Sequence, residues 1–382
     1  MADSIFSKST ESIIDHDEGK KEHTEPPMST IHHAAVALEH TGFSIGDQNG
    51  IKLFQLFPLN YRMYKNYVPK VGSVRIVKHM GLSNRLVYVS APDGKFPQNT
   101  AIVFDIEGNK DWREVTTPSR YGAITNVHVS QNRLVVFTGT RMFVFKFPDN
   151  IEQIRAEDIG PNPNGISAMS YDPTTTSCYI AYPGFKTGSV QIMNLNTLTA
   201  RESKSPVVIE AHLTEITQIA LNCQGTLIAT GSTKGTVVRV FDARTKGLLY
   251  ELRRGTVPAH LQCLAFSPCS CYLAVASDKG TLHLFGIRDA EPQKKMNVLE
   301  RNRGSSSILK IQLDRKVLAL GFSKPTETPK SFMGLVAICS DASYWRYHFT
   351  KDSNGKYMHL PPVYEKLIDF AEEASFFRVN VE

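Results

Sequence analysis

The sequence predicts an all-β protein, a seven-bladed WD40-type β-propeller, on three observations. Short apolar runs separated by turn residues fill the chain from about residue 31 onward, which is typical of a β-sandwich, barrel or propeller. Two stretches match at an offset of 45 residues, Ile216–Leu221 with Leu261–Phe266 and Gly231–Thr236 with Ala276–Thr281. That offset is the period of a four-stranded propeller blade. The chain from about residue 31 divides into seven such units, and seven blades are common in propellers.

The first 30 residues differ in composition from the rest of the chain. They hold seven acidic and three basic residues and end in Glu25-Pro26-Pro27. A polar, charged stretch of this kind cannot bury enough apolar surface to fold. We therefore expect a disordered acidic tail over residues 1–30 and the propeller over residues 31–382.

Each unit contributes apolar runs of strand length, separated by turn residues. In the first unit, Asn49-Gly50 is a strong hairpin signal between two such runs. The expected strands of units one to four and seven are 34–38, 42–46 and 50–56; 74–77, 85–89 and 100–105; 124–129, 133–137 and 141–145; 166–170, 177–182 and 188–193; and 317–320, 335–339 and 344–349. The matched stretches above supply units five and six. We expect the ring to close by pairing N- and C-terminal strands in one blade, because closure hides edge strands.

The sixth unit loses the strand pattern over residues 288–307. This stretch carries four cations and three apolar residues: Lys294, Lys295, Arg301 and Arg303, with Met296, Val298 and Leu299. Loops of this length in a compact unit are usually functional or disordered. A basic, partly apolar loop favours contact with a membrane surface, and plain disorder is the alternative.

The overall charge favours an anionic partner. Charged residues make up 21% of the 382 residues, and the formal net charge is +6. Without the first 30 residues the balance is 40 bases against 30 acids. A basic folded body favours a membrane surface or a nucleic acid. Stacking platforms for bases are missing, so we expect no nucleic acid.

Several classes of protein are excluded by what the sequence lacks. No run of about 18 apolar residues could span a bilayer, and no signal-peptide core follows the N-terminus. The cysteines have no C-x-x-C spacing, so we expect no metal and reduced thiols in a cytoplasmic protein. His212, Ser232 and Asp242 are triad residue types, but no nucleophile-elbow glycines surround Ser232. We expect no enzyme and no cofactor.

The dipeptide Arg253-Arg254 lies between the two matched units. Successive side chains of an extended segment point to opposite sides, so each arginine should face one of the two blades. A phosphomonoester is best held by Arg, Lys and hydroxyl donors, and the matched stretches supply Ser, Lys, Gly and Thr on both sides. The pattern predicts two adjacent anion sites.

These residues resemble a known family. Leu252-Arg253-Arg254-Gly255 is similar to the Phe- or Leu-Arg-Arg-Gly motif of the PROPPIN or WIPI family of phosphoinositide-binding WD-repeat β-propellers. The flanking runs T-K-G-T-V-V-R-V-F-D and S-D-K-G-T-L-H-L-F strengthen the match, and the Leu version is closest to the shorter WIPI subgroup. Phe147–Asn150 and Pro183–Ser189 also fit. The resemblance covers roughly residues 31 to 360 and is strongest from 180 to 286.

The resemblance implies a non-enzymatic effector that binds phosphatidylinositol 3-phosphate and phosphatidylinositol 3,5-bisphosphate and acts as a scaffold in autophagosome formation. It implies a cytoplasmic monomer, peripheral on preautophagosomal and endosomal membranes, with an autophagy lipid-transfer protein as partner. The implied first headgroup site is His212, Ser232, Thr233, Lys234, Thr236, Arg239 and Arg253. The implied second site is Arg254, His260, Ser277, Lys279, Thr281 and His283. The stretch 288–307 matches the family's membrane-inserting loop.

Each feature also has a structural interpretation. The arginine pair could be a solvated strand end, the Ser and Lys residues ordinary turn chemistry, and His212 a packing residue within a blade. The whole protein could be a WD-repeat interaction scaffold without lipid binding, because fold does not imply function. The sequence does not decide between the two lipids or locate the partner's docking surface, for which the loop 91–99 is a candidate.

Overall fold

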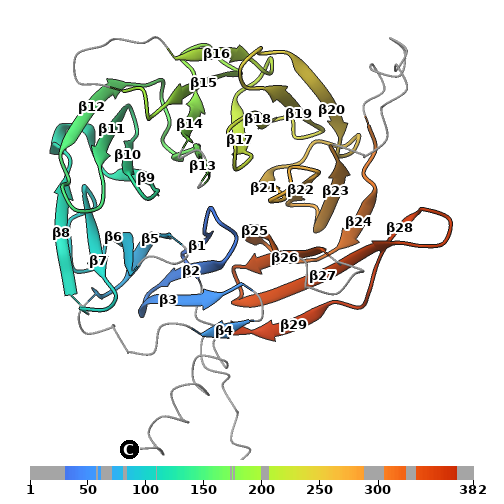
Figure 1. Ribbon diagram of the computed structural model, residues 1–382, viewed down its shortest axis with the longest axis horizontal. Coiled ribbons are helices and arrows are strands. Elements are labelled where there is room, and N and C mark those ends of the chain that lie inside the picture. Colours follow the sequence, from blue (N-terminus) through green and yellow to red (C-terminus); the bar gives the residue numbers. More distant parts are fainter. Residues whose placement is uncertain are drawn as a thin grey trace, which may run out of the picture.

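The structure, a computed structural model, describes residues 31–56, 59–61, 71–80, 84–108, 110–172, 174, 177–198, 206–287, 305–323 and 333–367. Within these residues the chain forms seven antiparallel β-sheets arranged in a ring (Figure 1). The expected all-β, seven-bladed propeller is confirmed. The predicted acidic tail and most of the predicted membrane loop lie outside the described residues.

Each blade is built from strands that are consecutive in the chain. Blade 1 contains β1 (His33–Val36), β2 (Gly42–Asp47), β3 (Gly50–Gln55) and β4 (Asn60–Tyr61), and blade 2 contains β5 (Val74–His79), β6 (Arg85–Ser90), β7 (Thr100–Asp105) and β8 (Lys110–Thr116). Blade 3 contains β9 (Ile124–Val129), β10 (Arg133–Thr138), β11 (Arg141–Lys146) and β12 (Gln153–Asp158), after a short 3-10 helix, η1 (Ser119–Tyr121). Blade 4 contains β13 (Ala168–Asp172), β14 (Ser177–Pro183), β15 (Ser189–Asn194) and β16 (Val207–Glu210).

The last three blades carry the residues of the predicted sites. Blade 5 contains β17 (Ile216–Leu221), β18 (Leu227–Ser232), β19 (Val237–Asp242) and β20 (Leu248–Arg253). Blade 6 contains β21 (Leu261–Phe266), β22 (Tyr272–Ser277), β23 (Thr281–Gly286) and β24 (Leu309–Gln312). Blade 7 contains β25 (Val317–Ser323), β26 (Met333–Cys339), β27 (Ser343–Lys351), β28 (Tyr357–His359) and β29 (Val363–Lys366).

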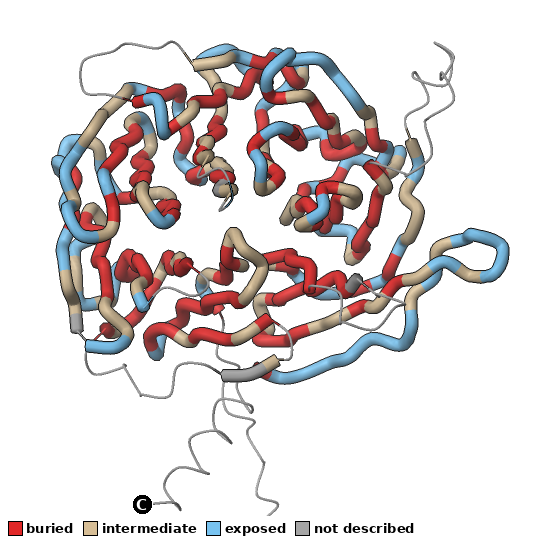
Figure 2. The backbone as a smooth tube through the Cα atoms, in the orientation of Figure 1, coloured by how far each residue is buried: buried red, intermediate tan, exposed pale blue. Residues whose placement is uncertain are grey.

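The expected strands correspond to the three inner strands of each blade. Their boundaries differ by up to three residues: the strand expected at 34–38 ends at Val36, the one expected at 166–170 begins at Ala168, and the one expected at 317–320 continues to Ser323. The fourth, outer strands were not predicted individually. Their side chains are mostly exposed or half-buried, as in β12 and β29, so they lack the apolar run that marks an inner strand. Figure 2 shows this gradient, with buried residues on the inner strands and exposed residues around the circumference.

The expectation that N- and C-terminal strands pair in one blade is wrong. Among the described residues, blade 1 consists of β1 to β4, and blade 7 consists of β25 to β29. The nine residues of β27 supply enough edge for two partners, since Ser343–Arg346 pairs with β29 and Phe349–Lys351 pairs with β28. Blade 7 therefore completes its own outer edge and needs no strand from the N-terminus.

Blades 1 and 7 are joined by packing instead of a shared strand. The Tyr344 hydroxyl in blade 7 donates to the Leu56 carbonyl, 2.8 Å away. The Tyr344 ring stacks on Phe43 of blade 1, with 6.0 Å between ring centroids. The backbone N–H of Ile31 donates to the Ser340 carbonyl at 3.3 Å. These contacts close the ring.

Buried apolar side chains gather between neighbouring blades. Among the described residues they form seven clusters, and each cluster combines residues of two adjacent blades. One example joins blades 5 and 6 through Val238, Leu252 and Leu261. Burial of this surface is the main favourable term in folding. It places the ends of β18 to β20 beside those of β21 to β23, where the matched turns lie.

Candidate functional site

Five segments of blades 4 to 6 follow one another along one rim of the ring. Backbone hydrogen bonds connect each to the next: His212 N–H to Gly188 O (2.9 Å), Thr233 N–H to Glu215 O (3.0 Å), Ala259 N–H to Lys234 O (3.4 Å) and Asp278 N–H to His260 O (2.9 Å). We call this surface the hairpin rim. It comprises residues 184–188, 211–215, 232–236, 254–260 and 277–281.

Two glycines of the matched turns are required by close packing on this rim. Gly235 has φ +59°, and a Cβ there would lie 1.7 Å from the Ala259 carbonyl oxygen. Gly280, at the equivalent place in blade 6, has φ +66°, and its Cβ would lie 2.4 Å from an Asp314 carboxylate oxygen. The left-handed conformation disfavours a side chain at both positions, and at Gly235 the backbone carbonyl also leaves no room for one.

Blade 4 carries a third turn of this kind, which the sequence comparison did not identify as a copy. Gly188 has φ +74°, and a Cβ would lie 1.9 Å from the His212 carbonyl oxygen. The sequence around it, Lys186-Thr187-Gly188-Ser189, shares the Gly and a hydroxyl residue with the other two turns. The Lys stands two residues before the Gly in this turn but directly before it in the other two, so a direct alignment does not reveal the repeat.

The two arginines of the predicted sites differ in exposure. Arg253 ends β20 and is exposed, whereas Arg254 is only 8% exposed. The Arg254 guanidinium donates through Nε to the Gly235 carbonyl (3.0 Å) and through Nη2 to the Val257 carbonyl. Burial lowers the pKa of Arg254, and nearby Asp278 opposes this. A guanidinium has five N–H donors, so three remain for a ligand.

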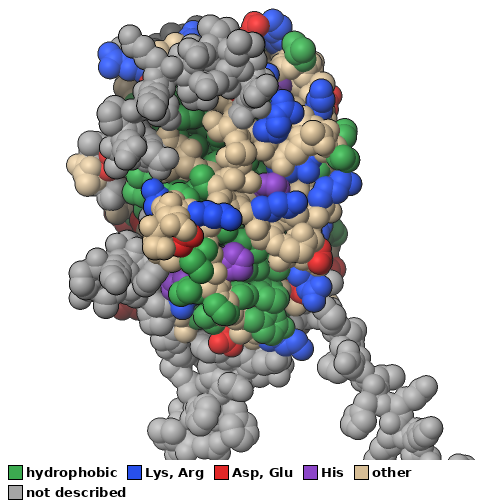
Figure 3. All heavy atoms as spheres, turned by 90° about the vertical axis from the view of Figure 1, so that its right-hand side faces the viewer, with side chains coloured by type: hydrophobic (Ala, Val, Ile, Leu, Met, Phe, Trp, Pro, Cys, Tyr) green, Lys and Arg blue, Asp and Glu red, His purple; other side chains and the backbone are tan. Residues whose placement is uncertain are grey.

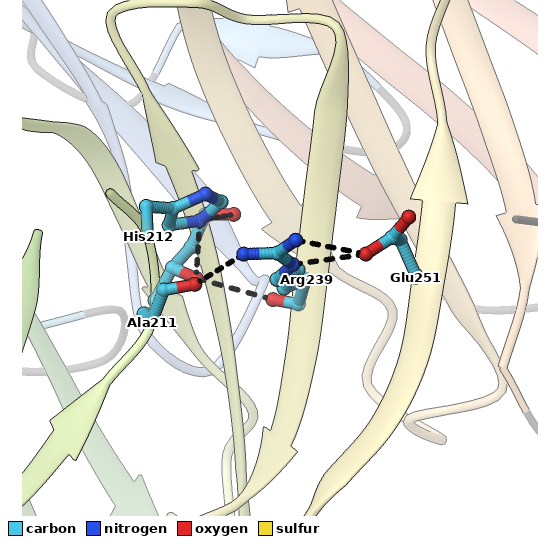
Figure 4. Close-up of polar contacts among 5 residues, drawn as sticks. Ala211, His212, Arg239 and Glu251 are labelled. Atoms are coloured by element: carbon cyan, nitrogen blue, oxygen red, sulfur yellow. Dashed lines mark hydrogen bonds and ion pairs between the residues drawn. The ribbon is translucent and has the colours of Figure 1, made fainter. Parts of the chain in front are cut away.

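Arg239 and His212 are engaged within the protein (Figure 4). Arg239 donates through Nε and Nη2 to Glu251, both at 3.0 Å, and through Nη1 to the Ala211 carbonyl at 2.8 Å. The His212 Nε2 lies 3.2 Å from the Thr230 carbonyl and 3.0 Å from its hydroxyl. These bonds tie the loop 211–215 to blade 5. Few N–H groups of these two side chains remain to bind a ligand. Both residues therefore mainly hold the loop 211–215 in place beside the predicted site.

Burial also decides the charge of His212. Burial and, to a smaller extent, the Arg239 cation lower the pKa of His212 to about 4, although the hydrogen bond to Thr230 opposes both. The imidazole is therefore neutral near pH 7. Because a carbonyl can only accept, Nε2 carries the proton and Nδ1 is left as an acceptor.

The rest of the predicted first site divides into exposed and buried members. Thr233 and Lys234 are exposed at the tip of the turn between β18 and β19. Ser232 and Thr236 are buried, at 4% and 6% exposure. The Thr236 carbonyl accepts the Arg254 N–H at 3.0 Å. The exposed side chains of this site are therefore Thr233, Lys234 and Arg253.

The predicted second site divides in the same way. Lys279 and His260 are exposed, while Ser277, Thr281 and His283 are buried. The Ser277 and Thr281 hydroxyls lie 3.5 Å apart. The His283 Nδ1 lies 3.2 Å from the Ser307 hydroxyl, and burial lowers its pKa to about 4. His283, like His212 in the first site, is therefore neutral near pH 7.

Asp278 is a site residue that the sequence reasoning did not weigh. It is exposed, and its carboxylate accepts the backbone N–H of His260 at 3.1 Å. Its negative charge favours the charged form of Arg254. It also reduces the attraction of a phosphate to the second site.

The end of the predicted membrane loop reaches the arginine pair. Ser305 accepts the Arg253 N–H (2.9 Å), and its own N–H donates to Glu251 O (2.8 Å). Residues 305–307 therefore run beside the end of β20. The seven side chains named for this loop, from Lys294 to Arg303, lie outside the described residues, so their role stays a prediction.

Cationic side chains gather on the side of the ring that carries the outer strands of blades 5 and 6 (Figure 1 and Figure 3). Figure 3 shows this side, with Lys and Arg in a row across the middle and hydrophobic and histidine side chains below. Among the residues that the structure describes, no three His, Cys, Asp or Glu side chains are grouped to hold a metal ion. No helix in the described ranges is long and apolar enough to cross a membrane.

A closed ring of seven antiparallel blades, six with four strands and one with five, and with cations along one rim, defines a WD-type β-propeller of the binding class. A family model described as PROPPIN matches residues 33–319. The chain belongs to the PROPPIN family, as the resemblance in sequence predicted. Members of this family are non-enzymatic effectors and scaffolds, so this chain is a binding protein and no enzyme.

Individual proteins support the same assignment. Ectopic P granules protein 6 of Caenorhabditis elegans is 66% identical over 362 residues, covering 94% of this chain and 93% of that protein. Autophagy-related protein 18 of Dictyostelium discoideum is 31% identical over 245 residues, covering 64% and 62%. The solved structure of Kluyveromyces lactis Hsv2 with its complete loop 6CD matches with a TM-score of 0.72 at 19% identity, covering 89% and 99%. This last likeness shows the fold alone.

Proposed function

We propose that this protein binds phosphatidylinositol 3-phosphate and phosphatidylinositol 3,5-bisphosphate on membranes through the hairpin rim, and acts as a scaffold in autophagosome formation. The observation that carries the proposal is the position of Arg253 and Arg254 between two matched Lys-Gly-Thr turns. Membership of the PROPPIN family and the relative named autophagy-related protein 18 support it.

The first site offers the donors that a phosphomonoester needs. Arg253, Lys234 and Thr233 are exposed around the end of β20, and none of the described carboxylates forms an ion pair with Lys234. Arg and Lys donors bind phosphate oxygens through charge-assisted hydrogen bonds. The neutral His212 adds no charge, so Arg253 and Lys234 supply most of the attraction.

The second site is weaker alone and acts by avidity. Arg254 and Lys279 supply its cations, and Asp278 partly offsets them. Once one headgroup is bound, a second lipid in the same membrane binds as an effectively intramolecular step. Two modest sites on one rim therefore give stable residence on a membrane that contains either lipid.

The partner and the compartment extend the same proposal. We expect an autophagy lipid-transfer protein as partner, with the loop 91–99 of blade 2 as a candidate surface, and peripheral attachment to preautophagosomal and endosomal membranes. Lys95 in that loop pairs with Asp111 of β8 at 2.9 Å, which holds the loop against the blade. Its position on blade 2 leaves the hairpin rim of blades 4 to 6 free for lipid.

Flotation of the purified chain with liposomes that each contain one phosphoinositide tests the proposal. The wild type should float with the two 3-phosphorylated lipids, and Arg253→Thr should reduce the bound fraction about tenfold, because a charge-assisted contact to phosphate is lost. Arg253→Thr with Arg254→Thr should abolish binding. If the wild type floats with no phosphoinositide, the protein is a WD-repeat scaffold without lipid binding.

Arg254 needs its own control because its guanidinium holds two backbone carbonyls. Arg254→Thr leaves these carbonyls without a donor and can loosen the loop 254–260. Arg254→Lys keeps the charge, and urea unfolding of every variant separates lost stability from lost binding. Partial binding in each single variant supports two sites, whereas complete loss in Arg253→Thr indicates one site.

A further inference from the structure

Three apolar side chains on the hairpin rim are exposed to an unusual degree. Leu213 is 97% exposed, Phe185 66% and Val257 62%, the three highest values for large apolar side chains in the described ranges. Scattered single exposures are common on soluble proteins. Here the three occupy three of four successive segments of one rim, 184–188, 211–215 and 254–260, so a shared role is the better explanation.

Two of these side chains flank the predicted first headgroup site. Leu213 lies in the loop 211–215, whose Glu215 carbonyl accepts the Thr233 N–H at 3.0 Å. Val257 lies in the loop 254–260, and its carbonyl accepts a hydrogen bond from the Arg254 guanidinium. The turn 232–236, with its exposed Thr233 and Lys234, is therefore held between the Leu213 loop and the Val257 loop.

Phe185 extends this arrangement by one segment. It lies in the turn 184–188, where the Gly188 carbonyl accepts the His212 N–H at 2.9 Å. The loop that follows His212 carries Leu213. Along the rim, exposed apolar side chains thus stand on either side of the exposed donors of the first site.

This combination fits a lipid in a membrane better than a soluble phosphate ligand. A soluble headgroup or free phosphate would contact the donors and leave Leu213 and Val257 in water. In a bilayer the headgroup lies at the level of the donors, and apolar side chains beside it reach the boundary of the acyl chains. Cations together with apolar side chains are the composition of such interfaces.

We propose that Leu213 and Val257, with Phe185 beside them, insert into the headgroup–acyl boundary when the rim binds a phosphoinositide. This inference rests on the proposed function. It adds an anchoring surface on the loops between blades 4, 5 and 6, in addition to the predicted loop 288–307. It also orients the molecule, because the ends of β18 and β20 at this rim must then face the bilayer.

Partition into vesicles of phosphatidylcholine with phosphatidylinositol 3-phosphate tests the anchor. Leu213→Ser should weaken partition roughly tenfold, and Val257→Ser by a smaller factor, because partition follows the apolar surface that is buried. Affinity for soluble inositol 1,3-bisphosphate, measured by calorimetry, should not change in either variant. Leu248→Ser is the matched control, since Leu248 is 52% exposed and lies at the opposite end of β20.

A second readout reports insertion directly. Leu213→Trp fluorescence should be quenched by lipids with brominated acyl chains after subtraction of the wild-type signal, and Leu248→Trp fluorescence should not. Unchanged partition of Leu213→Ser and Val257→Ser, with wild-type flotation intact, overturns the anchor but leaves the proposed function. An equal loss in Leu248→Ser also overturns it. A wild type that binds no phosphoinositide vesicle overturns both.

Discussion

His212 shows how burial decides what a side chain can offer a ligand. Its Nε2 donates to the Thr230 carbonyl, and its pKa is lowered to about 4 by burial and by Arg239. A neutral imidazole with that tautomer has only an acceptor left at Nδ1. In the folded protein near pH 7, His212 therefore brings no positive charge to a phosphate, and its contact with a headgroup stays a prediction.

The pKa of His212 leads to a pH dependence of stability. Between pH 6.5 and pH 4 the unfolded chain binds a proton at this residue that the folded chain does not, so the free energy of unfolding falls as the pH falls. The slope from one such group is at most about 1.4 kcal/mol per pH unit. Urea unfolding between pH 7 and pH 5 should show a shallower slope for His212→Gln than for the wild type. His283 has a similar pKa of about 4 and should keep part of the slope; identical slopes would contradict the assignment.

At the scale of the element, the hairpin of β19 and β20 separates positioning from binding. Arg239 and Glu251 lie directly opposite each other in this hairpin, and the pair is half-buried. Arg239 also holds the Ala211 carbonyl. Arg253, two residues beyond Glu251, ends the same strand and is exposed. One hairpin therefore presents one arginine to the neighbouring loop and another to the surface.

Two substitutions in this hairpin should have opposite effects. Arg239→Met should lower the free energy of unfolding by about 1–2 kcal/mol, because the Ala211 carbonyl and Glu251 lose their donors, while vesicle binding is largely kept. Arg253→Met should change stability by less than about 0.5 kcal/mol and should reduce vesicle binding. Urea unfolding and flotation of both variants check this. If Arg239→Met loses lipid binding at unchanged stability, Arg239 contacts the headgroup directly, as the family resemblance implied.

At the scale of the whole molecule, stability depends on seven blade interfaces and not on one central core. Each cluster of buried apolar residues joins two neighbouring blades, so the interface of blades 1 and 7 is equivalent to the others although its two blades come from opposite ends of the chain. Among the residues that the structure describes, no disulfide or shared strand supports that interface. The Tyr344 hydroxyl bonded to Leu56 supplies one of its few polar contacts.

Tyr344→Phe tests this closure. The substitution leaves the buried Leu56 carbonyl without a donor and should lower the free energy of unfolding by about 1–2 kcal/mol. Tyr347→Phe in the same blade is the control, because Tyr347 packs toward blade 6 and should be nearly neutral. Equal effects in thermal or urea unfolding would show that the Tyr344 bond does not support closure.

The fold and the location of the site were determined by local features of the sequence. Short continuous apolar runs mark the inner strands because both faces of these strands are buried, as in β2 and β18. The 45-residue repeat marks equivalent turns, and Gly235 and Gly280 recur in it because both need a positive φ and close packing. The positive φ is a property of the turn itself, so it is visible in the sequence.

Tertiary structure alone decided which residues of the site are available. Whether an arginine or a histidine faces a ligand depends on partners that are distant in the chain, as Arg254 with Gly235 and His212 with Thr230 show. Ring closure also depends on the tertiary structure, because β27 is long enough to pair with both β28 and β29. The exposure of Leu213 and Val257 is also a property of the assembled rim, because an isolated apolar residue between two strands is expected to be buried.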